Sequence, residues 1–289
     1  MEFHLAPLEN VSCWAFRSLC KGATDSYTGM LSLSNLVKRN NAWKEVDTFS
    51  IPEQRQWIQI ATSKEIECSA FIKRLQEELK NNPNKNNVYG IQLNASCPSP
   101  QLIKIGQGPA LIKRANKVTN LILELLKQDK FRVSIKVRLG LNQFEFEQRK
   151  IFALFESLKK INNPNFTGVT VHFKHAQQKS SEPYNYSILK DLLRYDVPII
   201  INGGIKTAND FIELTKNVPR NNISGFMVGR AAMQDPDALL KIKGDLCKAQ
   251  SINRPAGDIK KEFDSLCKIH PPNQIYLETI KEYCIWAKD

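Results

Sequence analysis

The sequence lacks the features that mark membrane, secreted and metal-stabilised proteins. No run of about 18 apolar residues occurs among its 289 residues, so we expect no membrane-spanning segment. The residues from Met1 to Leu5 lack the basic stretch and long apolar core of a secretory signal. The seven cysteines are odd in number and include no Cys-x-x-Cys pair, which argues against a disulfide framework and a structural zinc site. We therefore expect a cytoplasmic protein with no bound metal.

Acidic residues are also few, and their shortage is local. The chain has 29 Asp and Glu against 41 Lys and Arg, which gives a net charge of +12. Residues 72–160 account for most of the excess, with 17 Lys and Arg against 7 Asp and Glu. Cations that replace counterions along a phosphate backbone supply sequence-independent affinity for nucleic acid. Solvated helix faces in a Lys-rich chain have the same composition, so charge alone leaves both interpretations open.

Short apolar runs alternate with amphipathic segments along most of the chain. The runs that predict strands are Phe3–Leu8, Ser26–Met30, Trp57–Ala61, Val88–Asn94, Val133–Leu139, Gly168–Phe173, Val197–Asn202 and Gly225–Gly229. The segments that predict helices are Glu65–Leu79, Ala110–Leu126, Phe144–Leu158 and Ile188–Leu193. Eight strands in such an alternation predict an α/β fold, a (β/α)8 TIM barrel over residues 1–236. A doubly wound open sheet, the alternative, would usually have fewer strands.

The alternation stops after Asp235-Pro236. Residues 237–289 predict a small C-terminal helical domain. Its expected helices are Ala238–Gln250 and Gln274–Ala287, with breaks at Arg254-Pro255 and Pro271-Pro272.

Two glycine turns follow the last two predicted strands. They are Asn202-Gly203-Gly204 and Gly229-Arg230. Glycine lets a backbone approach a ligand closely, and barrels often bind phosphate between strands seven and eight. Arg230 would add a guanidinium to such an anion site. Plain tight turns beside a surface arginine are the alternative.

Three titratable side chains are predicted to point inward near the carboxyl ends of the strands. In Ser134-Ile135-Lys136-Val137-Arg138, alternation places Lys136 and Arg138 on the face opposite Ile135. Two buried cations need an anionic or electron-rich partner, such as a reduced flavin. An edge strand would instead expose both cations. His172 ends another strand and fits the same pocket, although a lone histidine is often a satisfied core residue.

The run Gly90–Pro98 ends a buried strand in a carboxamide, a hydroxyl and a thiol. Its residues Asn94, Ser96 and Cys97 precede Pro98, which cannot continue a strand ladder. An unperturbed thiol is mostly protonated at neutral pH, so Cys97 can act as a proton donor. The other six cysteines lie in helix-like segments, and we interpret them as packing residues: Cys13, Cys20, Cys68, Cys247, Cys267 and Cys284.

These residues together resemble one enzyme family, the flavin-dependent tRNA-dihydrouridine synthases. The similarity extends from Leu5 to about Pro236. The matching motifs, in the family's order, are Ala6-Pro7-Leu8-Glu9-Asn10-Val11-Ser12, Phe16-Arg17, Cys20, Tyr27-Thr28-Gly29-Met30, Gln59, Asn94-Ala95-Ser96-Cys97-Pro98, Gly106-Gln107-Gly108, Lys136-Val137-Arg138, His172, Asn202-Gly203-Gly204 and Gly229-Arg230.

The resemblance implies an FMN-dependent reduction of uridine to 5,6-dihydrouridine in tRNA, with NADPH as the reductant of the flavin. The implied contacts to the isoalloxazine are Pro7, Leu8, Glu9, Gln59, Lys136 and His172, and those to the phosphate are Asn202, Gly203, Gly204, Gly229 and Arg230. A flipped uridine would accept hydride at C6 and a proton from Cys97 at C5, with Asn94 and Arg138 contacting the substrate. The resemblance also implies tRNA contacts from the C-terminal helices, and we expect a monomer.

Several positions depart from the family pattern, and two rival functions stay open. Gly29, Gln101, Phe173-Lys174 and Gly204 replace an acidic residue, a lysine, a Gly-Arg pair and an aspartate. The run around Cys97 also resembles that of a dihydroorotate dehydrogenase, an FMN enzyme in which the cysteine is a base. A tRNA-binding protein with impaired catalysis is the third interpretation.

Overall fold

Eight parallel strands close into a barrel in the computed structural model of the chain, which describes residues 1–85, 87–219, 221–249 and 253–288. The strands are β1 (Glu2–Leu5), β2 (Asp25–Tyr27), β4 (Arg55–Ala61), β5 (Val88–Ala95), β6 (Arg132–Arg138), β7 (Phe166–His172), β8 (Ile199–Asn202) and β9 (Ile223–Val228). Each pairs in parallel with its neighbours, and the pairing of β2 with β4 closes the ring. The predicted TIM barrel is confirmed, and the open sheet is excluded.

The second predicted strand, residues 26–30, is shorter in the structure, where it ends at Tyr27. Its first part is β2, and a separate two-residue strand, β3 (Leu31–Ser32), pairs with the carboxyl end of β4. Between the two, the Thr28 N–H still donates to the Trp57 carbonyl oxygen at 2.9 Å. The chain therefore leaves β4 at Gly29 and returns to it farther along.

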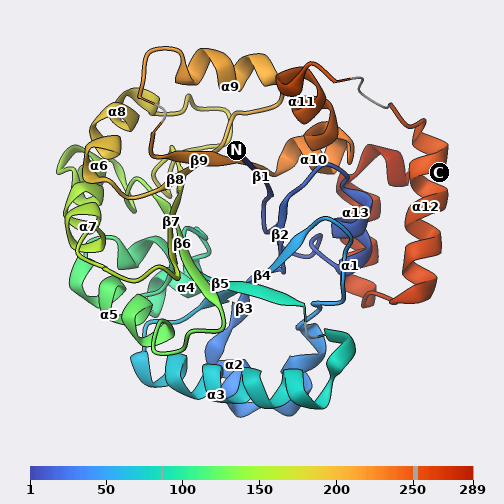
Figure 1. Ribbon diagram of the computed structural model, residues 1–289, viewed down its shortest axis with the longest axis horizontal. Helices are drawn as coiled ribbons and strands as arrows, with labels where there is room; N and C mark the ends of the chain where they lie inside the picture. Colours follow the sequence, from blue (N-terminus) through green and yellow to red (C-terminus); the bar gives the residue numbers. More distant parts are fainter. Residues whose placement is uncertain (86, 220, 250–252, 289) are drawn as a thin grey trace.

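Helices surround the sheet (Figure 1). They are α1 (Trp14–Leu19), α2 (Leu33–Lys38), α3 (Glu65–Asn81), α4 (Pro100–Lys104), α5 (Ala115–Leu125), α6 (Gln143–Glu147), α7 (Lys150–Leu158), α8 (Leu189–Leu192), α9 (Ala208–Thr215) and α10 (Arg230–Gln234), with 3-10 turns η1 (Asn40–Glu45), η2 (Pro83–Lys85), η3 (Gly108–Leu111), η4 (Tyr186–Ile188) and η5 (Leu193–Tyr195). β8 is buried between this layer and the barrel interior and is apolar on both faces, in Ile199-Ile200-Ile201.

Three predicted helices are interrupted. The segment 110–126 is a 3-10 turn followed by α5, and the segment 144–158 is divided into α6 and α7. Arg149 separates the latter two because its φ of 53° is left-handed, which ends a right-handed helix. The predicted helix 188–193 is the sequence η4, α8 and η5, and only α8 in it is α-helical.

Several helices have no predicted bounds, among them α1, α2, α9 and α12 (Ala256–Ile269). The sequence carried a signal for α9, because Thr207 and Asp210 form a capping box at its start. α1 and α2 have only six residues each, too few for a helical period to stand out.

The C-terminal segment is helical, as predicted. It contains α11 (Ala238–Cys247), α12, α13 (Gln274–Tyr283) and η6 (Ile285–Ala287), while Gln250, the predicted end of the first helix, lies outside the described residues. Figure 1 places α12 and α13 beside α1, and the Trp286 ring stacks on Phe16 with centroids 6.5 Å apart. The domain division at 236/237 stays a prediction.

The packing interpretation of the cysteines holds for four of the six. Cys13, Cys20, Cys68 and Cys284 are buried, and Cys267 is partly buried. For Cys247 the interpretation is wrong, because this residue ends α11 on the exposed side. None of the helices in the described ranges is long and apolar enough to cross a membrane.

A charged network closes the amino-terminal end of the barrel. Arg55 on β4 bonds Asp25 on β2 and Glu2 on β1, with its Nη2 2.6 Å from Asp25 Oδ2. His4 bonds Glu2 at 3.3 Å and the Tyr27 hydroxyl at 2.9 Å. The hydrogen bond with His4, together with Arg55, lowers the pKa of Glu2 to about 2 despite its burial. The network therefore joins three neighbouring strands at the end opposite the strand carboxyl termini.

We predict that Glu2→Gln lowers the free energy of unfolding by about 1 kcal/mol at pH 7, a figure reduced for the partial exposure of the carboxylate. A depressed folded-state pKa stabilises the protein above the unfolded value of 4.5. The difference between variant and wild type should shrink as pH falls from 4.5 towards 2. Urea unfolding at pH 7 and pH 3.5 measures it, with exposed Glu77→Gln as the control. A difference that is equal at both pH values contradicts the assignment.

Candidate active site

The strand register brings the predicted residues into two neighbouring rows at the carboxyl end of the barrel. Asn94 on β5 pairs with Lys136 on β6. One step farther along, Arg138, His172 and Asn202 lie side by side on β6, β7 and β8. Since this is the end where barrels build catalytic sites, the sequence prediction of one shared site fits the register.

Asn94 fixes the turn that presents Cys97. Its Oδ1 accepts the N–H groups of Ser96 at 3.0 Å and of Cys97 at 2.9 Å. Its Nδ2 donates to Gln59 Oε1 on β4 at 2.8 Å. The Asn94 side chain is buried, so these hydrogen bonds fix the turn to the barrel interior. The predicted contact of Asn94 with substrate stays a prediction, and holding this turn is an additional structural role.

A chain of buried amides continues from this turn across the barrel. Gln59 Nε2 donates to Gln92 Oε1 at 2.8 Å. Gln92 Nε2 lies 3.3 Å from Ser134 Oγ on β6 and 3.4 Å from Thr170 Oγ1 on β7. Both polar atoms of the Gln59 carboxamide thus form hydrogen bonds within the protein. Its contact with a cofactor stays a prediction.

Ser96 is the protein partner that the two cations of β6 share. Lys136 Nζ donates to Ser96 Oγ at 3.2 Å, and Arg138 Nε donates to the Ser96 carbonyl oxygen at 2.8 Å. β6 is paired with β5 on one side and β7 on the other, so the alternative of an exposed edge strand is wrong. Sequence reasoning gave Ser96 no role of its own, although it lies within the run that was singled out.

Burial sets the protonation of the groups on β6 and β7. Burial lowers the pKa of Lys136 to about 7, with a smaller contribution from Arg138. Burial, and then Lys136 and Arg138, lowers the pKa of His172 to about 2, so this imidazole is neutral. In the described part of the chain, neither cation of β6 forms a salt bridge with a carboxylate. The site therefore has positive charge to offer to a ligand.

The Cys97 thiol lies at the site, partly exposed. Burial raises its pKa, with Glu9 adding to the effect, so the thiol is the stable form at neutral pH. The loop that follows packs against the Cys97 backbone at Gly108, where a Cβ would come within 2.6 Å of the Cys97 carbonyl oxygen. Gly108 also has a φ of 59°, which favours glycine. Sequence reasoning assigned no role to this contact, although the motif 106–108 was part of the resemblance.

The two predicted glycine turns lie beside each other at the ends of β8 and β9. Asn202 Nδ2 donates to the Met227 carbonyl oxygen at 2.9 Å, which ties the turns together. Gly203 and Gly204 have φ values of 108° and 71° and need glycine. α10, which begins at Arg230, has only five residues, so anion binding here would depend on backbone N–H groups and Arg230 rather than on a long helix.

The loop after β1 borders these turns. A Cβ at Gly229 would lie 3.4 Å from Leu8 Cδ2, and the Leu8 N–H donates to Ser12 Oγ at 2.7 Å. Fully buried Arg17 holds the Ser12 carbonyl oxygen at 2.7 Å. Arg17 is a second residue whose role sequence reasoning missed. Of the three predicted contacts in this loop, Pro7 and Leu8 are half-buried and Glu9 is exposed.

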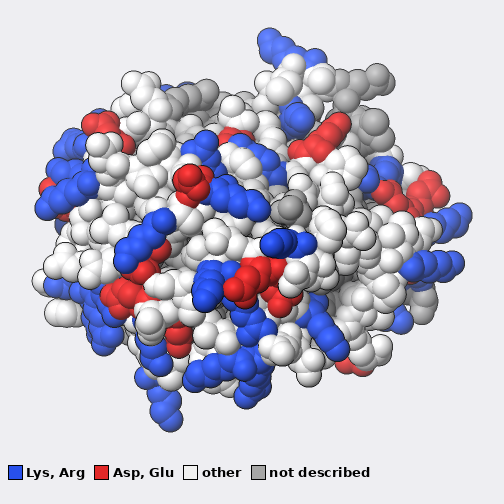
Figure 2. All heavy atoms as spheres, turned by 60° about the horizontal axis from the view of Figure 1, so that its bottom comes forward, with Lys and Arg blue, Asp and Glu red and all other residues white. Residues whose placement is uncertain are grey.

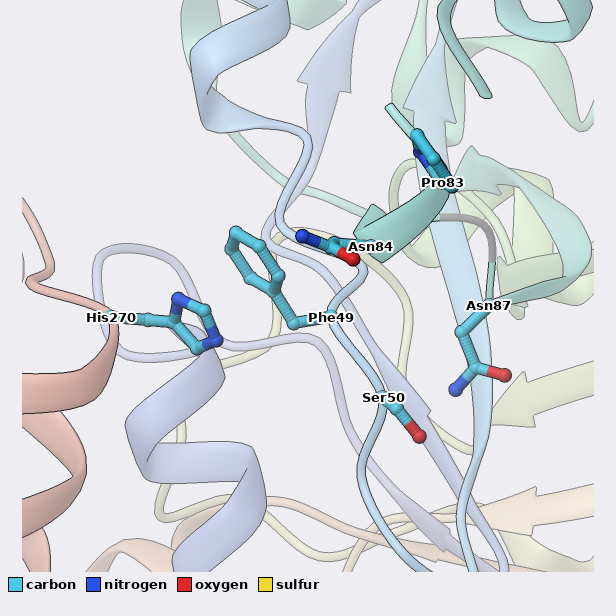
Figure 3. A pocket seen from close by; sticks show the side chains of 6 residues that line it. All are labelled: Phe49, Ser50, Pro83, Asn84, Asn87 and His270. Atoms are coloured by element: carbon cyan, nitrogen blue, oxygen red, sulfur yellow. The ribbon is translucent and has the colours of Figure 1, made fainter. Parts of the chain in front are cut away.

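A separate hollow of about 550 Å³ lies away from the site. Figure 3 shows its lining, which comes from segments that precede β4 and β5 and from the end of α12: Phe49, Ser50, Pro83, Asn84, Asn87 and His270. The His270 and Phe49 rings stack at 3.6 Å. These residues include none of the predicted site, which is built at the opposite ends of the strands.

Comparison with known proteins identifies the family. The dihydrouridine synthase (Dus) family model matches residues 4–277. This chain belongs to the dihydrouridine synthase family. The predicted membership and its enzyme class are thereby confirmed.

Curated relatives agree with this assignment. A probable tRNA-dihydrouridine synthase of Helicobacter pylori is 27% identical over 86% of this chain and 72% of its own length. The tRNA-dihydrouridine(20) synthases [NAD(P)+] of Schizosaccharomyces pombe and Saccharomyces cerevisiae are 23% and 27% identical, over 56% and 52% of this chain. The matches span only 33% and 39% of those two yeast proteins.

Solved structures share the fold alone. An Old Yellow Enzyme from a Pichia species superimposes with a TM-score of 0.52 at 10% identity, over 91% of this chain and 86% of its own. A chitinase from Pseudoalteromonas aurantia has the same score at 12% identity, over 86% of this chain and all of its own.

The residues at the barrel mouth fit a flavin at its ring end. Lys136 and Arg138 have no carboxylate partner among the described residues, so their charge can interact with an electron-rich ring system. Buried carboxamides beside them can hydrogen-bond a polar ring edge. The glycine turns offer backbone N–H groups where a phosphate would lie.

We predict that Lys136→Met raises the free energy of unfolding of the cofactor-free protein by at least about 1 kcal/mol at pH 6. At that pH the wild-type lysine is charged in both states, and the folded state loses its hydration. The gain should shrink above pH 7, because the folded lysine then releases its proton while the unfolded one keeps it to about 10.5. Urea unfolding at pH 6 and pH 9 tests this, with exposed Lys73→Met as the control. Equal stability of variant and wild type at pH 6 refutes it.

Proposed function

We propose that this protein reduces uridine to 5,6-dihydrouridine in tRNA, with FMN at the barrel mouth and NADPH as the reductant. The observation that supports this most is that a protonated thiol, just after β5, lies beside two cations at the end of β6 that lack a carboxylate partner in the described residues. Family membership supplies the reaction class, since relatives carry the name tRNA-dihydrouridine synthase.

Lys136 and His172 would hold the flavin ring, with Pro7, Leu8, Glu9 and Gln59 around it. The phosphate would lie at Asn202–Gly204 and at Gly229 with Arg230. Bound FMN would supply the hydride that adds to C6 of uracil. Lys136 has a lowered pKa of about 7, so its positive charge becomes favourable only when a partner of opposite charge lies beside it.

Cys97 would donate the proton to C5 of uracil. The Asn94 carboxamide holds the Cys97 backbone, and the close approach of Gly108 limits movement of the loop from the other side. Because burial raises the thiol pKa, the residue carries a proton at neutral pH and takes another from solvent after donation. This protonation state favours an acid over the base that a dihydroorotate dehydrogenase needs.

The uridine must leave the base stack to reach a site inside a barrel mouth. Arg138, partly exposed and bonded to the Ser96 carbonyl oxygen, would contact the flipped nucleotide, together with Asn94. The third interpretation, tRNA binding without catalysis, is less favoured, because Cys97 and His172 both lie near Lys136.

Cations on the protein surface would bind the tRNA backbone. Figure 2 shows Lys and Arg spread over the side of α2 and α3, with acidic side chains among them. Several cations of residues 72–160 are neutralised, as in the pair of Lys117 with Glu65 at 2.5 Å. Unpaired cations near the mouth are therefore the better candidates, and the C-terminal helices would add contacts.

We predict that Cys97→Ala keeps FMN binding and flavin reduction by NADPH but slows reoxidation of the flavin by tRNA at least about 100-fold. Only the proton donor is removed, so hydride supply to the flavin is untouched. Stopped-flow absorbance of the flavin separates the two half-reactions.

The matched control is Cys247→Ala, at an exposed cysteine on α11. It should behave as wild type in both half-reactions. Unchanged reoxidation in the Cys97 variant would remove the thiol from the mechanism, and consumption of dihydroorotate by the wild type would favour the rival enzyme.

We predict that affinity for unmodified tRNA falls at least about tenfold between about 50 and 200 mM salt. Lys104, exposed on α4 next to the Cys97 loop, should contribute, so Lys104→Gln should reduce the slope of log affinity against log salt by about one. Lys117→Gln, in the ion pair with Glu65, is the control and should change the slope less. A flat salt response in wild type contradicts phosphate binding.

A further inference from the structure

One aromatic residue covers the glycine turn at the end of β8. A Cβ placed on Gly203 would lie 2.3 Å from Tyr184 Cε1, and one placed on Gly204 would lie 3.1 Å from Tyr184 Cε2. The ring is therefore in direct contact with the backbone that would hold a phosphate. It belongs to the irregular segment between β7 and η4.

The neighbours of this ring include two cations. Arg230 Nη2 donates to the Tyr184 hydroxyl at 3.2 Å. Lys174 Nζ lies 4.6 Å from the ring centroid, and the neutral ring of His172 lies 5.7 Å away. Across the described ranges, neither Arg230 nor Lys174 forms a salt bridge with a carboxylate. Arg230 thus bonds the hydroxyl of this phenol, while Lys174, whose Nζ donates to the carbonyl oxygens of Lys179 and Ser180, lies near the ring.

A phenol is a weak substitute for an anion. Its ring face attracts a cation, and its hydroxyl oxygen accepts one hydrogen bond. A phosphate would bind the same guanidinium with two charged oxygens and would also accept backbone N–H groups. Tyr184 therefore compensates the charge of Arg230 only in part, through contacts that a phosphate can replace.

We propose that Tyr184 occupies the place of the FMN phosphate when no cofactor is bound, and must leave Gly203 and Arg230 before FMN can bind. We call this place, beside Gly203, Gly204 and Arg230, the phosphate seat. This inference rests on the proposed function, since it assumes that FMN binds at the barrel mouth. Tyr186 anchors the segment, because its ring stacks on Tyr184 at 5.5 Å and its hydroxyl donates to the Gly203 carbonyl oxygen. The fraction of protein in which Tyr184 has left the seat then sets how strongly the phosphate contributes to FMN binding.

This competition affects the phosphate and not the flavin ring. FMN and riboflavin share the ring system, and only FMN carries the phosphate. The apparent affinity for FMN is reduced by the fraction of protein in which the seat is open. Riboflavin has no group for this seat, so its affinity reports only effects on the flavin ring. The ratio of the two affinities therefore reports the competition and cancels changes elsewhere.

The test is titration of the cofactor-free full chain with FMN and with riboflavin, followed by quenching of flavin fluorescence. We expect Tyr184→Ala to raise the preference for FMN over riboflavin at least about tenfold, because the seat is then always open. Tyr184→Phe keeps the ring and loses the hydrogen bond to Arg230, so its preference should rise about threefold. Tyr89→Phe is the matched control, since it removes a Tyr–Arg contact, to Arg55 at 3.4 Å, at the other end of the barrel.

A preference that stays constant or falls in both Tyr184 variants overturns the inference, and Tyr184 is then a fixed wall of the cofactor site. That result leaves the proposed function intact. Failure of wild type and all variants to bind either flavin overturns the inference together with the proposed function.

Discussion

Two cations at the end of β6, Lys136 buried and Arg138 partly exposed, have no carboxylate partner among the described residues, and the site depends on this constraint. Lys136 and Arg138 both bond Ser96, one through its hydroxyl and one through its carbonyl oxygen. An uncompensated buried charge destabilises a fold, so we expect an electron-rich ligand to bind beside these residues. Stability of the empty protein and affinity for a flavin are therefore opposed at Lys136.

The same turn links this charge to the chemistry. Ser96 lies between Asn94, which holds the turn through two backbone N–H groups, and Cys97, the proposed acid. The loop with Gly108 closes the turn from the other side. A shift of Ser96 would move the cations and the thiol together. Proton donor and charge are thus positioned as one unit, which limits how the substrate can approach the flavin.

The barrel and most of the site could be predicted because their signals are local in the sequence. Alternating apolar runs identify strands, and strand ends identify the positions of Asn94, Lys136 and His172. The interruption at Arg149 and the role of Tyr184 could not be predicted in this way. The first depends on a left-handed φ in a non-glycine residue, and the second on contact between residues 19 positions apart, Tyr184 and Gly203. Single-sequence patterns report periodicity and do not report such contacts.

The central claim is that this barrel mouth reduces uridine in tRNA. Its most direct test is mass spectrometry of nucleosides from an unmodified tRNA transcript incubated with the purified chain, FMN and NADPH. The account predicts a nucleoside two mass units heavier than uridine, at defined positions, and none when NADPH or the protein is omitted. Recovery of uridine alone, from protein shown to contain FMN that NADPH reduces, would contradict it.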